Sequence, residues 1–153
     1  MSVFFVPKDK HKVVVSFDNG QTQEGSVFLE RCTQDRDVSR MMAEFLQRTD
    51  DSVFLPLQRE DGTTEFINTS HVATIETDRP DESGLAFYVR LNVKLMLADA
   101  PGGDITGTLL AEAPQERSRL SDCLNMPSRF IAVLTADKLR YVNRRLVKKA
   151  VLA

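Results

Sequence analysis

The densest group of charged side chains lies near the end of the printed sequence. Six cations fall within about twelve residues, and the nearest acid is Asp137; the six are Lys138, Arg140, Arg144, Arg145, Lys148 and Lys149. Such a density can attract a phosphate backbone or an acidic protein surface. A site for single-stranded nucleic acid also needs exposed aromatic side chains, and Tyr141 has a counterpart, Phe66, that indicates a core position. The six residues are therefore candidate contacts to an acidic protein or to RNA. The alternative is that they are solvent-facing cations that discourage edge-to-edge strand pairing.

Other chemistry finds little support in the sequence. The two histidines, His11 and His71, are far apart and have no partner motif for a metal, and we expect His71 at a half-buried sheet position. Cys32 and Cys123 form no CxxC pair, so we interpret both as reduced thiols that pack as small apolar groups. There is no GxSxG elbow, Walker loop or GxGxxG loop. We predict no catalytic, cofactor-binding or metal-binding residues, and no enzymatic activity.

The composition is that of an ordinary globular protein. The 153 residues are 42% hydrophobic and 27% charged, which excludes collagen-like, low-complexity and wholly disordered chains. No apolar run approaches the roughly 20 residues of a membrane-spanning helix. The opening MSVFFVPKDKHK places apolar residues before basic ones, the reverse of a secretory signal. We therefore expect a cytoplasmic protein without a membrane partner.

The charge is divided unevenly between the two halves. Residues 1–78 contain 8 Lys and Arg against 14 Asp and Glu, a net charge of −6, whereas residues 79–153 contain 12 against 8, a net charge of +4. This asymmetry indicates that the halves face different partners or each other. The acidic half is a natural partner for the basic half, within one chain or between chains.

Both halves show the same order of predicted elements. Each has a strand-like apolar run, a polar turn and a second apolar run entered through Gly25 or Gly107. An amphipathic helix follows, over 38–46 in the first half and over 120–124, capped by Ser118, in the second. Further strand-like runs end both halves. This order predicts an internal duplication, with a first repeat and N-terminal leader at 1–78, a linker at 79–85 and a second repeat at 86–153.

The size of the repeats predicts how they are arranged. A repeat of about 65 residues buries only about 60% of its unfolded surface, so the two repeats should share a core, and Met1–Asp78 alone should be unfolded or aggregate. Tight turns are expected at Asn19-Gly20 and Asp61-Gly62, and short antiparallel connections exclude a doubly wound parallel sheet. The prediction is an all-β fold with short helices, made of two tandem related five-stranded barrels packed together.

The second half carries a more specific pattern of apolar residues and glycine: Val93-x-Leu95, Ile105-x-Gly107-x-Leu109, Phe130-Ile131-Ala132-Val133, Tyr141-Val142-Asn143 and Val147. The pattern resembles the Sm-like branch of small SH3-like barrels, which pair a bent five-stranded sheet with a helix. The sequence departs from that class in two ways. The helix is expected between strands two and three, and Asn143-Arg144-Arg145 replaces the basic-Gly pair that helps to form the RNA pocket of the class.

Two functional hypotheses follow from the sequence as a whole. The first is a non-catalytic interaction or regulatory module that assembles as a homo-oligomer. The second, which the resemblance implies, is an Sm-like RNA-binding protein that uses the basic strands of the second repeat.

Overall fold

The computed structural model describes residues 8–30, 54–80, 88–97, 103–111, 119–125 and 129–153. The strands of the first half are β1 (Lys8–Phe17), β2 (Thr22–Glu30), β3 (Phe54–Gln58), β4 (Thr64–Asn68) and β5 (Val72–Asp78). Those of the second half are β6 (Val89–Leu97), β7 (Asp104–Ala111), β8 (Phe130–Leu134), β9 (Lys138–Asn143) and β10 (Val147–Leu152). The prediction of an all-β fold is confirmed.

Short helical segments connect some of these strands. The 3₁₀ turns η1 (Thr69–His71) and η4 (Arg144–Leu146) lead into β5 and β10, and α2 (Leu120–Leu124) precedes β8. The helix predicted over 120–124 is therefore confirmed, with Arg119 as its N-cap residue and no side-chain cap bond. The helix predicted over 38–46, Ser118 and Cys32 lie outside the described residues.

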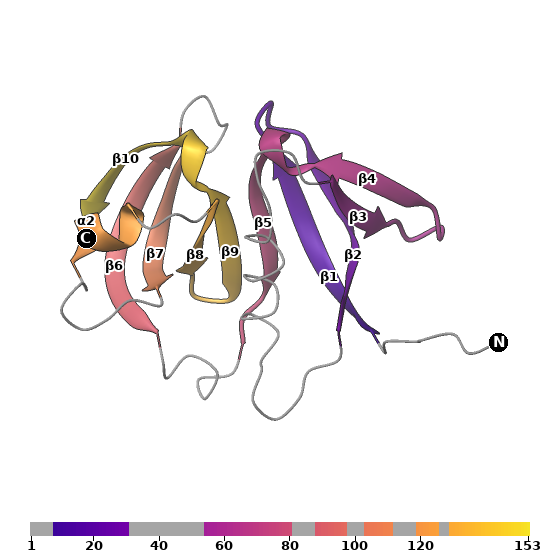
Figure 1. The fold of residues 1–153 in the computed structure, drawn as a ribbon, viewed down its shortest axis with the longest axis horizontal. Helices are drawn as coiled ribbons and strands as arrows, with labels where there is room; N and C mark the ends of the chain where they lie inside the picture. The colour runs from indigo at the N-terminus through magenta and orange to yellow at the C-terminus, as the bar shows by residue number, and fades with distance from the viewer. Residues whose placement is uncertain (1–7, 31–53, 81–87, 98–102, 112–118, 126–128) are drawn as a thin grey trace.

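All ten strands form one antiparallel sheet, in the order β10-β6-β7-β8-β9-β5-β1-β2-β3-β4 (Figure 1). The sheet is not closed, so two separate barrels are not confirmed, and β4 and β10 are its outer strands. The first five strands follow the order β5-β1-β2-β3-β4, and the second five follow the equivalent order β10-β6-β7-β8-β9. The two halves meet where β5 pairs with β9.

Glycines with left-handed backbone form two of the hairpin turns. Gly20 and Gly62 both have φ of 88°, a region that residues with a Cβ rarely adopt. The residue before each glycine accepts a hydrogen bond from the backbone two positions further on, at 3.0 Å from Asn19 Oδ1 and 2.9 Å from Asp61 Oδ1. These contacts stabilise tight turns, so the predicted turns at Asn19-Gly20 and Asp61-Gly62 are confirmed.

Two further glycines allow the second strand of each half to approach the third. A Cβ added at Gly25 would lie 2.5 Å from Leu57 Cγ, and one at Gly107 would lie 2.5 Å from the carbonyl oxygen of Leu134. Both distances are well inside van der Waals contact. The glycines that enter the second apolar run of each half in the sequence therefore occupy corresponding close contacts in the fold.

Within the described part of the chain, the buried side chains form two core clusters. One combines residues of both halves: Val13, Val15, Val27, Leu55, Leu57, Ile67, Val72 and Ile75 with Leu110, Phe130, Leu134, Leu139 and Tyr141. The other, around Leu95, Leu109 and Cys123, contains residues of the second half. The first half thus completes its core with side chains of the second, as a unit too small to bury its own apolar surface requires.

Candidate functional site

The junction between the two halves joins acids of β5 to bases of β9. The strands pair from Thr74 opposite Val142 to Asp78 opposite Lys138. Asp78 Oδ1 accepts a hydrogen bond from Lys138 Nζ at 2.9 Å, and Glu76 Oε2 lies 3.0 Å from Arg140 Nε. Two of the six candidate cations therefore pair with acids of the first half of the same chain.

The contact between Asp78 and Lys138 shifts the titration of both groups. Hydrogen bonding to the Lys138 ammonium, assisted by its charge, lowers the pKa of the Asp78 carboxyl below its ordinary value of 3.8. The same hydrogen bond raises the pKa of Lys138 above 10.5. Both groups are fully ionised near neutral pH, so the pair is an ion pair there, but its exposure to solvent makes it a weak source of stability.

Asn143 links the halves through the buried part of the junction. Its side chain is 1% exposed; Nδ2 donates to the Val72 carbonyl oxygen at 2.9 Å, and Oδ1 accepts from Arg145 N at 3.1 Å. Asn68 makes the corresponding second contact, accepting from Ser70 N at 3.0 Å. Asn143 lies beside β5, whereas Asn68 lies on the outer strand β4. No described strand of this chain lies beside Asn68 on its outer side.

The other four candidate cations are spread over η4 and the start of β10. Arg144 donates to the Leu124 carbonyl oxygen at the end of α2, at 3.2 Å. Arg145, Lys148 and Lys149 are exposed, and Lys148 lies at an irregularity in the pairing of β10 with β6. The six residues that are clustered in the sequence are therefore divided between an internal junction and an outer strand.

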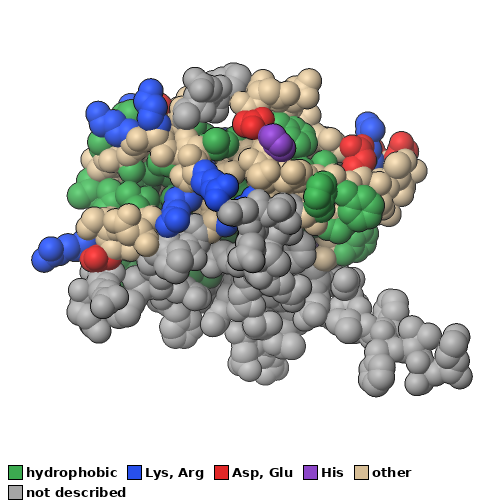
Figure 2. Space-filling view, turned by 45° about the horizontal axis from the view of Figure 1, so that its top comes forward, with side chains coloured by type: hydrophobic (Ala, Val, Ile, Leu, Met, Phe, Trp, Pro, Cys, Tyr) green, Lys and Arg blue, Asp and Glu red, His purple; other side chains and the backbone are tan. Residues whose placement is uncertain are grey.

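Large apolar side chains are exposed toward the outer strands of the sheet. Phe54 and Phe66, on β3 and β4, are 55% and 66% exposed, and Leu152 on β10 is 65% exposed, whereas Phe28 on the inner strand β2 is 41% exposed. Figure 2 shows hydrophobic side chains reaching the surface at both ends of the molecule. Exposed apolar groups beside an unpaired strand edge favour pairing with another strand.

Tyr141 and Phe66 occupy corresponding positions in the two halves but have opposite environments. Each stands two residues before the asparagine that caps the following 3₁₀ turn. Tyr141 is 1% exposed because it enters the cluster formed mainly by first-half residues. Phe66 has no such neighbouring half on its side of the sheet. The expectation of a core Tyr141 is confirmed, whereas the core position inferred for Phe66 is wrong.

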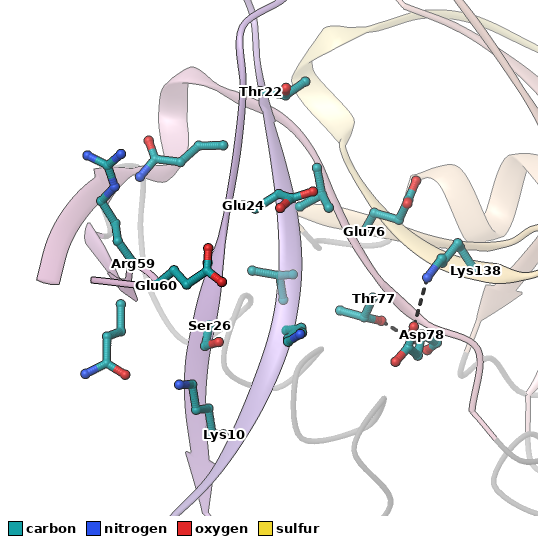
Figure 3. A pocket seen from close by; sticks show the side chains of 16 residues that line it. Lys10, Thr22, Glu24, Ser26, Arg59, Glu60, Glu76, Thr77, Asp78 and Lys138 are labelled. Carbon is teal, nitrogen blue, oxygen red and sulfur yellow. Dashed lines mark hydrogen bonds and ion pairs between the residues drawn. The ribbon is translucent and has the colours of Figure 1, made fainter. Parts of the chain in front are cut away.

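A groove of about 680 Å³ opens beside the junction, between β1, β2 and β5 (Figure 3). Its walls carry both signs of charge, including Lys10, Glu24, Arg59 and Glu60, and its edge includes the ion pair between Asp78 and Lys138. Neither histidine nor cysteine occurs among the described residues that line it. The same lining does carry the hydroxyl residues Thr22, Ser26 and Thr77.

The described histidine and cysteine side chains are not gathered into a metal site. His71 is exposed in η1, with Nδ1 3.3 Å from Asp18 Oδ2, so the half-buried sheet position expected for it is wrong. Cys123 is a buried free thiol whose pKa burial raises above the ordinary value of 9.0, which makes it less reactive. Within the described ranges, no three His, Cys, Asp or Glu residues are placed to hold a metal ion. No described helix has the length and apolar character to cross a membrane.

Sequence reasoning did not identify Glu76 and Asp78 as the partners of β9, nor Phe66 as an exposed residue. The sequence does contain a signal for the two acids. Glu76 and Asp78 are two residues apart, and the bases Lys138 and Arg140 are also two residues apart. Residues two apart lie on one face of a strand, so matching pairs of opposite charge could have indicated neighbouring strands. No such signal distinguishes Phe66 from a core aromatic residue.

Comparisons with protein-family models, with curated proteins and with solved structures found no match.

Proposed function

We propose that this protein is a non-catalytic interaction module that assembles as a homo-oligomer through the outer strands of its sheet. In this proposal the units at 1–78 and 86–153, joined by the linker 79–85, are related copies of one small five-stranded, Sm-like barrel unit. The shared strand order and the corresponding close-contact glycines support that relation.

One observation carries the proposal. Among the residues that the structure describes, the outer strands β4 and β10 each pair on one side only, and each exposes a large apolar side chain, Phe66 on one and Leu152 on the other. Natural proteins usually protect an edge strand with charges, proline or a covering segment. β10 does carry the exposed cations Lys148 and Lys149, but they stand at the start of the strand, so the apolar side chains further along both edges support pairing between chains.

Sedimentation velocity of the full chain tests the proposal. We expect the protein to sediment as a multiple of 17.2 kDa and the average mass to fall at low concentration. A mass of one chain throughout the range from about 1 to about 100 µM, where weak and moderate self-association is detected, would rule out the assembly.

RNA is the second candidate partner, and the exposure of Arg145, Lys148 and Lys149 on η4 and β10 favours it. The burial of Tyr141 weighs against it, because this aromatic ring is not available for base stacking. An electrophoretic shift with single-stranded RNA would decide the matter. RNA binding requires a shift that weakens steeply with salt and is lost when Lys148 and Lys149 are replaced by Glu.

A further inference from the structure

We infer that β4 of one chain pairs with β10 of the next chain, in the register that β5 and β9 use within the chain. This inference rests on the proposed function and specifies the contact that forms the assembly. The partner surface is a second copy of this chain, and the contact is head to tail, because one copy contributes β4 and the other contributes β10.

The strand order defines which strands correspond. In the internal junction, the last strand of the first half (β5) pairs with the fourth strand of the second half (β9). The two outer strands are the fourth strand of the first half (β4) and the last strand of the second half (β10). A chain therefore carries both sides of the same junction a second time, at opposite ends of its sheet (Figure 1).

The local geometry fixes the register of the proposed contact. Asn68 and Asn143 cap η1 and η4, and Val72 and Val147 follow these turns. In both last strands the pairing register shifts directly after this valine. Ala73 is skipped where β5 pairs with β1, and Lys148 is skipped where β10 pairs with β6. Superimposing these features places Phe66 opposite Ala150 of the next chain, as Tyr141 lies opposite Ile75 within the chain.

The apolar surfaces at the two ends fit this pairing. Tyr141 of the second half fills the core of the first half. The corresponding Phe66 is 66% exposed, and at the other end Leu97, Val147 and Ala150 are only partly buried against the second-half cluster. The pairing would bring the Phe66 ring to this incomplete core, as Tyr141 already does in the internal junction.

Charge distinguishes the internal junction from the contact between chains. Within the chain Glu76 lies opposite Arg140, whereas the same register places Val151 opposite Glu65 between chains. Exchange of strands would place Glu76 opposite Glu65, and like charges directly opposite each other destabilise a strand pair. The ion pairs therefore direct β5 to β9 and leave the more apolar β10 for β4.

Lys148 and Lys149 do not prevent this contact. Lys148 lies at the irregularity in β10, and the corresponding Ala73 lies at the irregularity in β5. In the internal junction β5 pairs with β9 from Thr74 onward, beyond that irregularity. The equivalent stretch of β10 begins at Lys149, whose aliphatic stem can lie along the sheet while its ammonium reaches water.

A charge exchange across the proposed pair tests the register. Val151→Glu places an acid opposite Glu65, whose carboxylate lies 3.0 Å from Arg59 within the chain, and should raise the dissociation constant of the assembly about fivefold. The double variant Val151→Glu with Glu65→Arg recreates an acid–base pair and should recover most of the assembly. Thr106→Glu, which adds the same charge to an exposed position on the inner strand β7, should leave the assembly unchanged. Sedimentation velocity measures the association, and circular dichroism confirms that each variant is folded.

The outcomes separate this inference from the proposed function. A wild-type protein that stays at 17.2 kDa overturns both, and the open edges would then be available to strands of other proteins. An oligomer that Val151→Glu leaves intact, or that the Glu65→Arg substitution does not restore, overturns the β4–β10 pairing and leaves self-assembly standing. Loss with Val151→Glu and recovery in the double variant support the pairing, whether the head-to-tail contacts close into a ring or continue as a filament.

Discussion

The two asparagines that cap η1 and η4 provide a matched test of the internal junction. Asn143→Ala removes a cap bond to Arg145 N and the hydrogen bond to the Val72 carbonyl across the junction. Asn68→Ala removes the corresponding cap bond to Ser70 N on the open strand β4. Asn68→Ala also removes the hydrogen bond that Ser70 Oγ donates to Asn68 Oδ1 at 2.7 Å, so the difference between the two variants gives a minimum value for the bond between the halves.

The structure sets the magnitudes. Loss of a capping side chain costs about 1 kcal/mol, and this applies to both variants. In Asn143→Ala the Val72 carbonyl also loses its side-chain partner at a buried site, which costs a further 1–3 kcal/mol or so. We expect the free energy of unfolding to fall by about 2–4 kcal/mol for Asn143→Ala and by about 1 kcal/mol for Asn68→Ala.

Urea unfolding followed by circular dichroism measures both values. The substitutions are made in the Val151→Glu background, so that contacts between chains do not contribute to the stability of Asn68. Equal slopes with denaturant are needed for the comparison, because a changed slope indicates a changed unfolded or native state. Equal losses of stability for the two variants would show that the buried junction bond contributes no more than the bond between Ser70 Oγ and Asn68 and would refute the reasoning.

Three further predictions concern stability. Gly107→Ala should lower the free energy of unfolding by about 1–3 kcal/mol, because the new methyl group contacts the β8 backbone. Gly62 has open space around it, so Gly62→Ala should lower the free energy of unfolding by only about 1 kcal/mol, through its backbone conformation. Urea unfolding that ranks the two variants in the opposite order would contradict this. The fragment Met1–Asp78 should be unfolded or aggregate, and a cooperative melt of a monomeric fragment would show that it needs no shared core. Because the pKa of Asp78 is lowered in the folded state, its ion pair stabilises the fold above pH 3.8 and this contribution is lost as pH falls below 3.8. The denaturation midpoint of Asp78→Asn should therefore depend less on pH in that range, and an unchanged dependence would count against the ion pair.

Local structure was largely accessible from the sequence. Asn19-Gly20 and Asp61-Gly62 predict tight turns because glycine adopts the positive φ that those turns require. Gly25 and Gly107 stand at the entry to an apolar run in both halves, and both lie where a side chain would collide with the third strand. These features depend on neighbouring residues in the chain, which a sequence displays directly.

Burial at the strand edges was not accessible, because it depends on which strand lies next to which. Phe66 and Tyr141 have the same local pattern, yet one is 66% and the other 1% exposed, since only β9 has a neighbouring half beside it. The sequence predicts a sheet position for His71, but His71 and its counterpart Leu146 both lie in 3₁₀ turns, where alternation no longer determines which side chain faces the core. The division of the basic cluster has the same origin: Arg140 meets Glu76 only because β9 lies next to β5.

The connection between β5 and β6 would make the contact within the chain independent of protein concentration, unlike the proposed contact between chains. Only ten residues separate Asp78 from Val89, so the β5–β9 contact forms between tethered partners at an effective concentration of the order of millimolar. A contact between β4 and β10 of separate chains has no such tether and depends on the amount of protein present. If the proposed oligomer dissociates at low protein concentration, it should therefore release whole chains. Each chain would keep its β5–β9 junction paired and would expose β4 and β10 again.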